Sequence, residues 1–89
     1  MKVYKEYLRF IPNTPIYTDV QGELLTIEKQ KDRIVAYFDA DAPYYHKYLI
    51  YFVQTGQQVD VQDTKYLKTL MFKDGDYVIH IFIKEIFEW

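Results

Sequence analysis

The sequence predicts a mainly β protein: a small antiparallel sandwich or partly open barrel of about six strands, with at most one short helix. Apolar and polar residues alternate with a period of two along most of the chain, as they do in strands. These runs are rich in aromatic and β-branched residues, and the 89 residues include ten tyrosines and six phenylalanines. Such residues favour extended structure. The length predicts one domain over residues 1–89, because a chain this short has room for a single core.

The first half of the chain contains four candidate strands. Residues 2–10 form an aromatic-rich run that ends before Pro12 and Pro15, whose rings remove backbone donors. A short extended piece follows at 16–18, ahead of the turn signal at Gly22. Segments 23–30 and 33–39 alternate regularly. The two residues between them predict a hairpin turn, although this turn lacks the glycine that is usual there.

The second half contains a dense apolar run and the clearest hairpin. The run covers residues 46–54 and ends at Thr55-Gly56. Residues 57–65 are weakly patterned and predict a polar connection, or one short helical turn beginning near Asp63. Any longer helix is confined to residues 60–69. Segments 66–72 and 77–85 form the hairpin, because Asp74-Gly75 supplies the positive φ that its turn needs.

The central strands are apolar on both faces. In segment 77–85, Val78, His80 and Phe82 oppose a face of tyrosine and isoleucines. Two compatible interpretations account for this: a two-sheet core that covers both faces, and packing of the second face or an edge strand on a second copy of the chain. The short length favours a homo-oligomer. The residues expected in the core include Tyr48, Phe52, Ile79 and Ile81.

Composition and charge exclude several classes of function. The chain has no cysteine and no serine, and its net charge is −2. It therefore lacks disulfides, the commonest nucleophiles and the basic field that duplex nucleic acid requires. We expect no membrane segment, because the longest apolar stretch is far too short to span a bilayer. The N-terminus does not resemble a signal peptide, and the absence of cysteine fits a reducing cytoplasm.

The sequence contains few residues in patterns that suit catalysis or metal binding. Asp39, Asp41 and His46 are the nearest approach to a metal site, but a capping role for the aspartates is simpler, so we expect no metal and no cofactor. His80 is expected to bond a neighbouring side chain rather than to act as a general base. The threonines show no obvious base beside them. The sequence therefore predicts that the protein is not an enzyme.

Several polar and aromatic residues could instead form a binding site for a ligand. Tyrosine and histidine rings can stack on a nucleotide base, and lysine and arginine can bind its phosphates. Glutamine can hydrogen-bond the edge of the base, and the backbone N–H groups of a Thr-Gly turn can bind an anion. The opposing interpretation places the two tyrosines in an interface and pairs the two arginines with carboxylates. The candidate ligand-binding residues are Arg9, Arg33, Tyr44, Tyr45, His46, Lys47, Thr55, Gly56 and Gln57.

The chain resembles a family of small uncharacterised bacteriophage proteins. The resemblance rests on Val-Tyr-Lys-x-x-Leu at 3–8, Leu-x-x-Ile at 24–27 and Asp-x-Asp-x-Pro at 39–43. It continues with Val-x-Thr-Gly at 53–56, Tyr-Leu-x-Thr at 66–69 and Tyr-Val-Ile-His-Ile-Phe at 77–82. Where the family has Thr-Gly-His, this chain has Gln57 after Gly56. The resemblance implies a phage origin and action in the bacterial host cytoplasm.

Small phage proteins of this kind often counter host defence, which gives three hypotheses for function. The first is a non-catalytic protein that sequesters a cyclic nucleotide or ADP-ribose-type immune signal at a subunit boundary. The second is an inhibitor that contacts a host defence enzyme directly. The third is an accessory virion or assembly subunit. A pocket lined by Tyr, Arg or Lys favours the first, and a flat aromatic patch favours the second.

Overall fold

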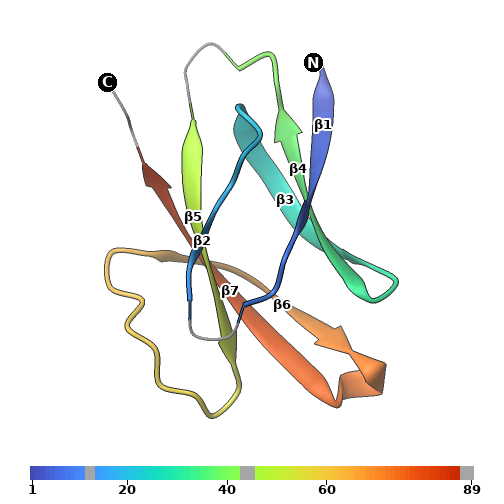
Figure 1. The fold of residues 1–89 in the computed structure, drawn as a ribbon, viewed down its shortest axis with the longest axis vertical. Coiled ribbons are helices and arrows are strands. Elements are labelled where there is room, and N and C mark those ends of the chain that lie inside the picture. The colour runs from blue at the N-terminus through green and yellow to red at the C-terminus, as the bar shows by residue number, and fades with distance from the viewer. Residues whose placement is uncertain (12–13, 43–45, 87–89) are drawn as a thin grey trace.

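The computed structural model describes residues 1–11, 14–42 and 46–86. Within these residues the chain forms seven strands in two antiparallel sheets that pack face to face as an open sandwich (Figure 1). The predicted fold class is confirmed, and the sheets do not close into a barrel. No helix in the described part is long and apolar enough to cross a membrane. The strands are β1 (Val3–Leu8), β2 (Ile16–Tyr17), β3 (Glu23–Gln30), β4 (Arg33–Asp39), β5 (Lys47–Gln54), β6 (Lys65–Phe72) and β7 (Tyr77–Ile86).

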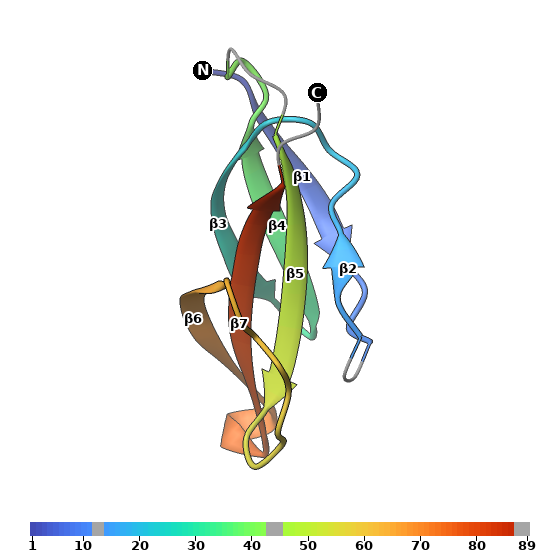
Figure 2. The ribbon, with the colours of Figure 1, turned by 90° about the vertical axis from the view of Figure 1, so that its left-hand side faces the viewer.

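One sheet has the order β1-β4-β3 and the other the order β2-β5-β7-β6. Figure 2 shows the two layers, with β5 and β7 in front of β4 and β1. The bounds of β3 and β4 match the sequence prediction, and β5 begins one residue later than predicted. Of the two alternatives for the stretch before β6, the polar connection is found: residues 57–64 contain no helical turn, and Asp63 is part of a turn before β6. The short helix found is the 3₁₀ turn η1 (Lys73–Gly75) between β6 and β7.

The core lies between the sheets and takes one face of each strand. In β4 it takes Ile34, Ala36 and Phe38, and in β5 it takes the alternate residues of the dense apolar run. Because side chains alternate across a strand, a one-residue shift of register would expose this whole set. All four residues that the sequence placed in the core are buried there. The buried core comprises Leu8, Ile27, Ile34, Ala36, Phe38, Tyr48, Ile50, Phe52, Leu70, Ile79 and Ile81.

Hydrogen bonds connect the two sheets along both open sides. On one side the Glu6 carboxylate accepts bonds from the backbone N–H groups of Asp19 and Val20, each at 2.9 Å. On the other side Lys29 Nζ donates to the carbonyl of Met71 at 2.9 Å. Glu6 of β1 thus bonds the connection between β2 and β3, and Lys29 of β3 bonds β6 of the second sheet.

The Glu28 carboxylate of β3 also accepts a hydrogen bond from the ammonium of Lys68 on β6. Thr26 donates to the same carboxylate from its hydroxyl at 2.8 Å. These two bonds favour the charged form and lower the pKa of Glu28 below its usual value. In the core, burial raises the pKa of Tyr48, whose hydroxyl accepts a bond from the backbone N–H of Leu24 at 3.0 Å.

Candidate functional site

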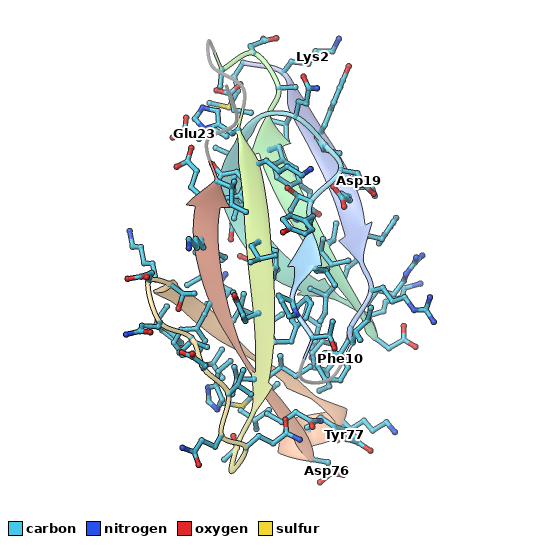
Figure 3. The ribbon with its side chains drawn as sticks, turned by 60° about the vertical axis from the view of Figure 1, so that its left-hand side comes forward. Lys2, Phe10, Asp19, Glu23, Asp76 and Tyr77 are labelled. Atoms are coloured by element: carbon cyan, nitrogen blue, oxygen red, sulfur yellow. The ribbon has the colours of Figure 1, made fainter. Side chains whose placement is uncertain are left out.

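The candidate site lies at the end of the sandwich where the β3–β4 turn, the β6–β7 turn and the end of β5 come together. We call this the hairpin end. Figure 3 shows Phe10 and Tyr77 toward this end and Lys2 and Glu23 toward the opposite end. A cleft of about 290 Å³ opens here between the two sheets. This central cleft is lined by Phe10, Lys31, Asp32, Ile34, Gln54, Phe72, Lys73, Tyr77 and Ile79.

The walls of the central cleft are mainly aromatic and aliphatic. Phe10 meets the core ring of Phe52 edge to face, with ring centroids 5.6 Å apart and an interplanar angle of 71°. Ile34 and Ile79 close the inner wall, and both are buried. The sequence folds this way because Phe10 follows β1 at the level where the β3–β4 hairpin turns. The cleft therefore offers rings and methyl groups to a ligand.

Lysines stand at the mouth of the cleft. Lys31 and Lys73 line the cleft, and Lys73 Nζ lies 5.1 Å from the centroid of the Tyr77 ring. Such a cation–π contact stabilises the position of an ammonium beside a ring at modest energy. A flat apolar cleft with cations at its mouth suits a planar ligand that carries negative charge.

Backbone conformations that are rare for non-glycine residues gather at the hairpin end. Lys31, Lys73 and Asp74 have φ values of 56°, 51° and 54°. The region at positive φ costs free energy for a residue with a side chain, and it is enriched at binding sites. In the first turn Lys31 takes the positive φ that the missing glycine would otherwise supply. The chain thus places two long cationic side chains at strained positions beside the cleft.

Two further hollows adjoin the central cleft. The first, which we call the outer hollow, has a volume of about 270 Å³ and shares two residues with the cleft. Its lining consists of Tyr7, Gln30, Lys31, Asp32 and Arg33. The second, the loop hollow, has a volume of about 480 Å³ and shares Gln54 and Tyr77 with the cleft. Its lining consists of Gln54, Thr55, Gln57, Gly75, Asp76, Tyr77 and Val78. Because each of these two hollows shares lining residues with the central cleft, we call the three together the belt of hollows.

Several residues predicted for the site lie along this belt. Arg33 lines the outer hollow, while Thr55 and Gln57 line the loop hollow. Gly56, between them, has a φ of 88° and sits in the turn that ends β5. Arg9 directly precedes Phe10 and is exposed. The sequence did not predict that Phe10, Lys31 and the β6–β7 turn would join them, because only the packing of two sheets brings these segments together.

The arginines do not pair with carboxylates, contrary to the opposing interpretation of the sequence. Within the described residues neither Arg9 nor Arg33 makes an ion pair. The guanidinium of Arg33 lies over the Tyr7 ring instead, with Cζ 3.8 Å from the ring centroid. A tyrosine on the neighbouring strand takes the place of the expected carboxylate. The positive charge of Arg33 is therefore directed toward solvent and the outer hollow.

His46 and Lys47 lie at the opposite end of the sandwich. His46 precedes β5 and Lys47 begins it, whereas Thr55 follows its end, so about 26 Å separates Lys47 from Thr55 at about 3.3 Å per residue. His46 Nδ1 contacts the Glu85 carboxylate, and its ring stacks on Tyr48 at 6.3 Å. The predicted residues Tyr44 and Tyr45 lie outside the described residues. Within one chain, the predicted set is therefore not brought together as one site.

The threonines do have a base beside them, which corrects the sequence prediction on this point. His80 of β7 contacts Thr55 Oγ1 through Nε2 at 2.8 Å and Thr69 Oγ1 through Nδ1 at 2.9 Å. The Thr69 hydroxyl also contacts the Tyr66 hydroxyl at 2.6 Å. The pattern of single residues could not reveal this, because the three partners come from β6, β7 and the turn after β5. The expected bonding of His80 to neighbours is confirmed.

No group of metal ligands is present among the described residues. Asp39 accepts a hydrogen bond from the backbone N–H of Asp41 at 3.0 Å through its side chain. This is the local capping role that the sequence favoured for the aspartate pair over metal binding. The carboxylate oxygen of Asp39 is therefore engaged in shaping its own loop.

The comparison with protein families identifies the chain through nearly its whole length. The model of the family DUF7352, a domain of unknown function, matches residues 1–88. The chain belongs to this family. No curated protein and no solved structure matches it. The family assignment carries no activity, so the function must be argued from the belt of hollows itself.

Proposed function

We propose that this protein is a non-catalytic binding protein that captures a planar, negatively charged small molecule of the nucleotide class at the hairpin end. The observation that carries the proposal is the central cleft, in which three aromatic side chains lie between two sheets and lysines stand at the mouth. The rings offer stacking surfaces, which are worth about 1–3 kcal/mol per base in nucleic-acid binding proteins. The lysines supply donors for phosphate oxygens.

The polar groups around the cleft support a nucleotide over a purely apolar ligand. Gln54 lines both the cleft and the loop hollow, where its amide can donate to and accept from the edge of a base. Thr55 and Gln57 extend this polar wall. Asp32 is the one carboxylate among the described lining residues of the cleft, so the ring of a base and its phosphates would meet mostly rings and cations there.

Sequestration is the form of binding that we propose, in keeping with the absence of serine and cysteine. The ligand would be a cyclic nucleotide or ADP-ribose-type immune signal, and the protein a phage counter-defence factor in the bacterial cytoplasm. A homo-oligomer belongs to the same proposal, because a second copy packed across the open cleft would cover a bound ligand. Removal of the ligand from solvent would strengthen its contacts with rings and cations alike.

A thermal-shift panel tests this proposal. Purified protein is heated with cyclic di- and oligonucleotides, ADP-ribose derivatives and matching nucleosides. A ligand at a hundredfold excess over its Kd should stabilise the fold by about 2.7 kcal/mol, and for a domain of this size this raises Tm by about 11–22 °C. The variant Phe10→Ala should lose the shift, whereas Met71→Ala, on the outer face of the other sheet, should keep it. If no compound of the panel raises the Tm, the proposal is refuted.

Inhibition of a host protein by direct contact is the second candidate, and the outer face of the β2-β5-β7-β6 sheet favours it. Leu49, Tyr51 and Phe82 are half-buried on this face, while Tyr66 and Met71 are exposed to 52% and 60%. Apolar patches of this kind mark interaction surfaces. Met71→Lys should abolish inhibition of a host defence enzyme while leaving ligand-induced thermal shifts intact. The accessory virion subunit remains the third hypothesis, and ring or fibre assemblies by electron microscopy would favour it.

A further inference from the structure

Two cations lie against the ring of Tyr7: Arg33, which lines the outer hollow, and Lys5 beside it. Arg33 Cζ lies 3.8 Å from the centroid of Tyr7, and Lys5 Nζ lies 5.1 Å from the same centroid. The Lys5 ammonium also donates a hydrogen bond to the Tyr7 hydroxyl at 3.2 Å. These contacts follow from register, because Lys5 and Tyr7 alternate onto the outer face of β1 while Arg33 begins the neighbouring strand β4.

The cations of this hollow have no carboxylate partner. Within the described residues, Lys5, Lys31 and Arg33 make no ion pair. A guanidinium that lies over a ring uses its flat face and keeps its N–H edges available, and those edges match two oxygens of a phosphate at once. The contact with the ring also restricts the side chain in advance, which lowers the entropic cost of binding.

We infer that the outer hollow is a phosphate subsite whose main group is Arg33, oriented by Tyr7 and assisted by Lys5 and Lys31. The inference rests on the proposed function, because the subsite adjoins the central cleft through Lys31 and Asp32. A ligand with its ring in the cleft would extend its phosphate or pyrophosphate past the β3–β4 turn onto Arg33. The ligand class is thereby narrowed to phosphorylated nucleotides, since a nucleoside would leave these cations unused.

Asp32 lines the same hollow and sets a limit on its affinity. Its carboxylate stands in the two-residue turn between Lys31 and Arg33 and repels an incoming anion. Replacement by asparagine keeps the shape of the side chain and removes the repulsion. Asp32→Asn and Arg33→Met should therefore change phosphate affinity in opposite directions. A purely structural role for either residue would not produce this pair of results.

Titration with inorganic pyrophosphate, followed by NMR chemical shifts and calorimetry at low salt, tests the subsite separately from the cleft. Arg33→Met should weaken pyrophosphate binding about tenfold, the low end for a charge-assisted contact at an exposed site. Asp32→Asn should strengthen it about threefold, as expected from one screened charge at short range. Tyr7→Leu, which keeps the charge but removes the ring, should weaken it less than Arg33→Met. Lys84→Met, an exposed lysine late in β7, is the control and should leave it unchanged.

The outcomes distinguish this inference from the proposed function. Each variant is first checked for the wild-type Tm, so that loss of binding is not loss of the fold. Pyrophosphate that binds equally to Arg33→Met and wild type, or that binds neither, overturns the phosphate subsite. A nucleoside that still shifts the Tm in that case leaves the proposed cleft function standing. Pyrophosphate binding that responds to Arg33 and Asp32 as expected supports the subsite even if every nucleoside fails.

Discussion

Replacement of Lys31 by glycine should raise the stability of the ligand-free protein while removing a cation from the proposed site. Lys31 has a φ of 56° in the β3–β4 turn. The left-handed region costs a residue with a side chain about 1–2 kcal/mol. Glycine in turn lowers the free energy of unfolding by about 0.5–1 kcal/mol, because the unfolded chain has more conformational freedom at a glycine. The difference is a net gain of about 0.5 kcal/mol, or about 3 °C in Tm for a domain of this size.

Urea denaturation and differential scanning calorimetry of the ligand-free protein measure this gain. The matched control is Lys84→Gly, because Lys84 is also an exposed lysine but lies in the extended strand β7. There glycine relieves no strain and should cost about 0.5–1 kcal/mol. Lys31→Met keeps the strained backbone without the charge and should weaken ligand binding at unchanged stability. If Lys31→Gly lowers the urea midpoint as much as the control does, strain is not stored at this turn and the reasoning is refuted.

Three further predictions concern stability. Gly22→Ala should lower the free energy of unfolding by more than about 2 kcal/mol, because the new Cβ would lie 2.6 Å from a main-chain carbonyl oxygen at a φ of 146°. Gly75→Ala, where the new Cβ meets open space, should lower it by about 1 kcal/mol. Chemical denaturation compares the two variants, and equal losses of stability would contradict the close approach at Gly22. Ile27→Ala, at a position with no exposure, should cost about 2–5 kcal/mol in the same assay, and a loss under 1 kcal/mol would place it outside the core. The bond from Lys68 lowers the pKa of Glu28 from 4.5, so its stabilisation is complete above the unfolded pKa and is lost as pH falls through the lower folded pKa. Because the pair is substantially exposed, Glu28→Gln should remove only about 0.3 kcal/mol of stability at pH 7 and make stability less dependent on pH below about 4.5; an unchanged dependence in acid would refute this prediction.

Much of the fold could be predicted because local pattern and tertiary packing agree. In β3 and β4 the alternation continues to the residues on both sides of the turn, so their bounds were predicted correctly. The β6–β7 hairpin was predicted from Asp74-Gly75, and both residues have positive φ. The segment before β6 was less predictable, since its polar residues have no periodicity and its turn depends on the strand that follows.

The candidate site was only partly predictable. Arg33, Thr55 and Gln57 were selected for their chemistry, and they line the belt of hollows. Phe10 and Lys31 were not selected, because a core aromatic residue and a turn lysine carry no signal of their own in sequence. Their role depends on which turn of the first sheet faces which turn of the second. Sheet order and register decide that, and neither is encoded by a local pattern.

The sequence by itself determined that the chain would form antiparallel strands, that Tyr48, Phe52, Ile79 and Ile81 would be buried, and where the hairpins would turn. These features follow from side-chain alternation and from the φ preferences of a few residues, both of which act within a short stretch of chain. Only the tertiary structure decided where each of the other tyrosine rings lies and what it contacts. Tyr77 lines the cleft and Tyr7 lies under Arg33. The physical reason is that a half-buried ring takes its partner from another strand, and the pairing of strands is a property of the whole fold.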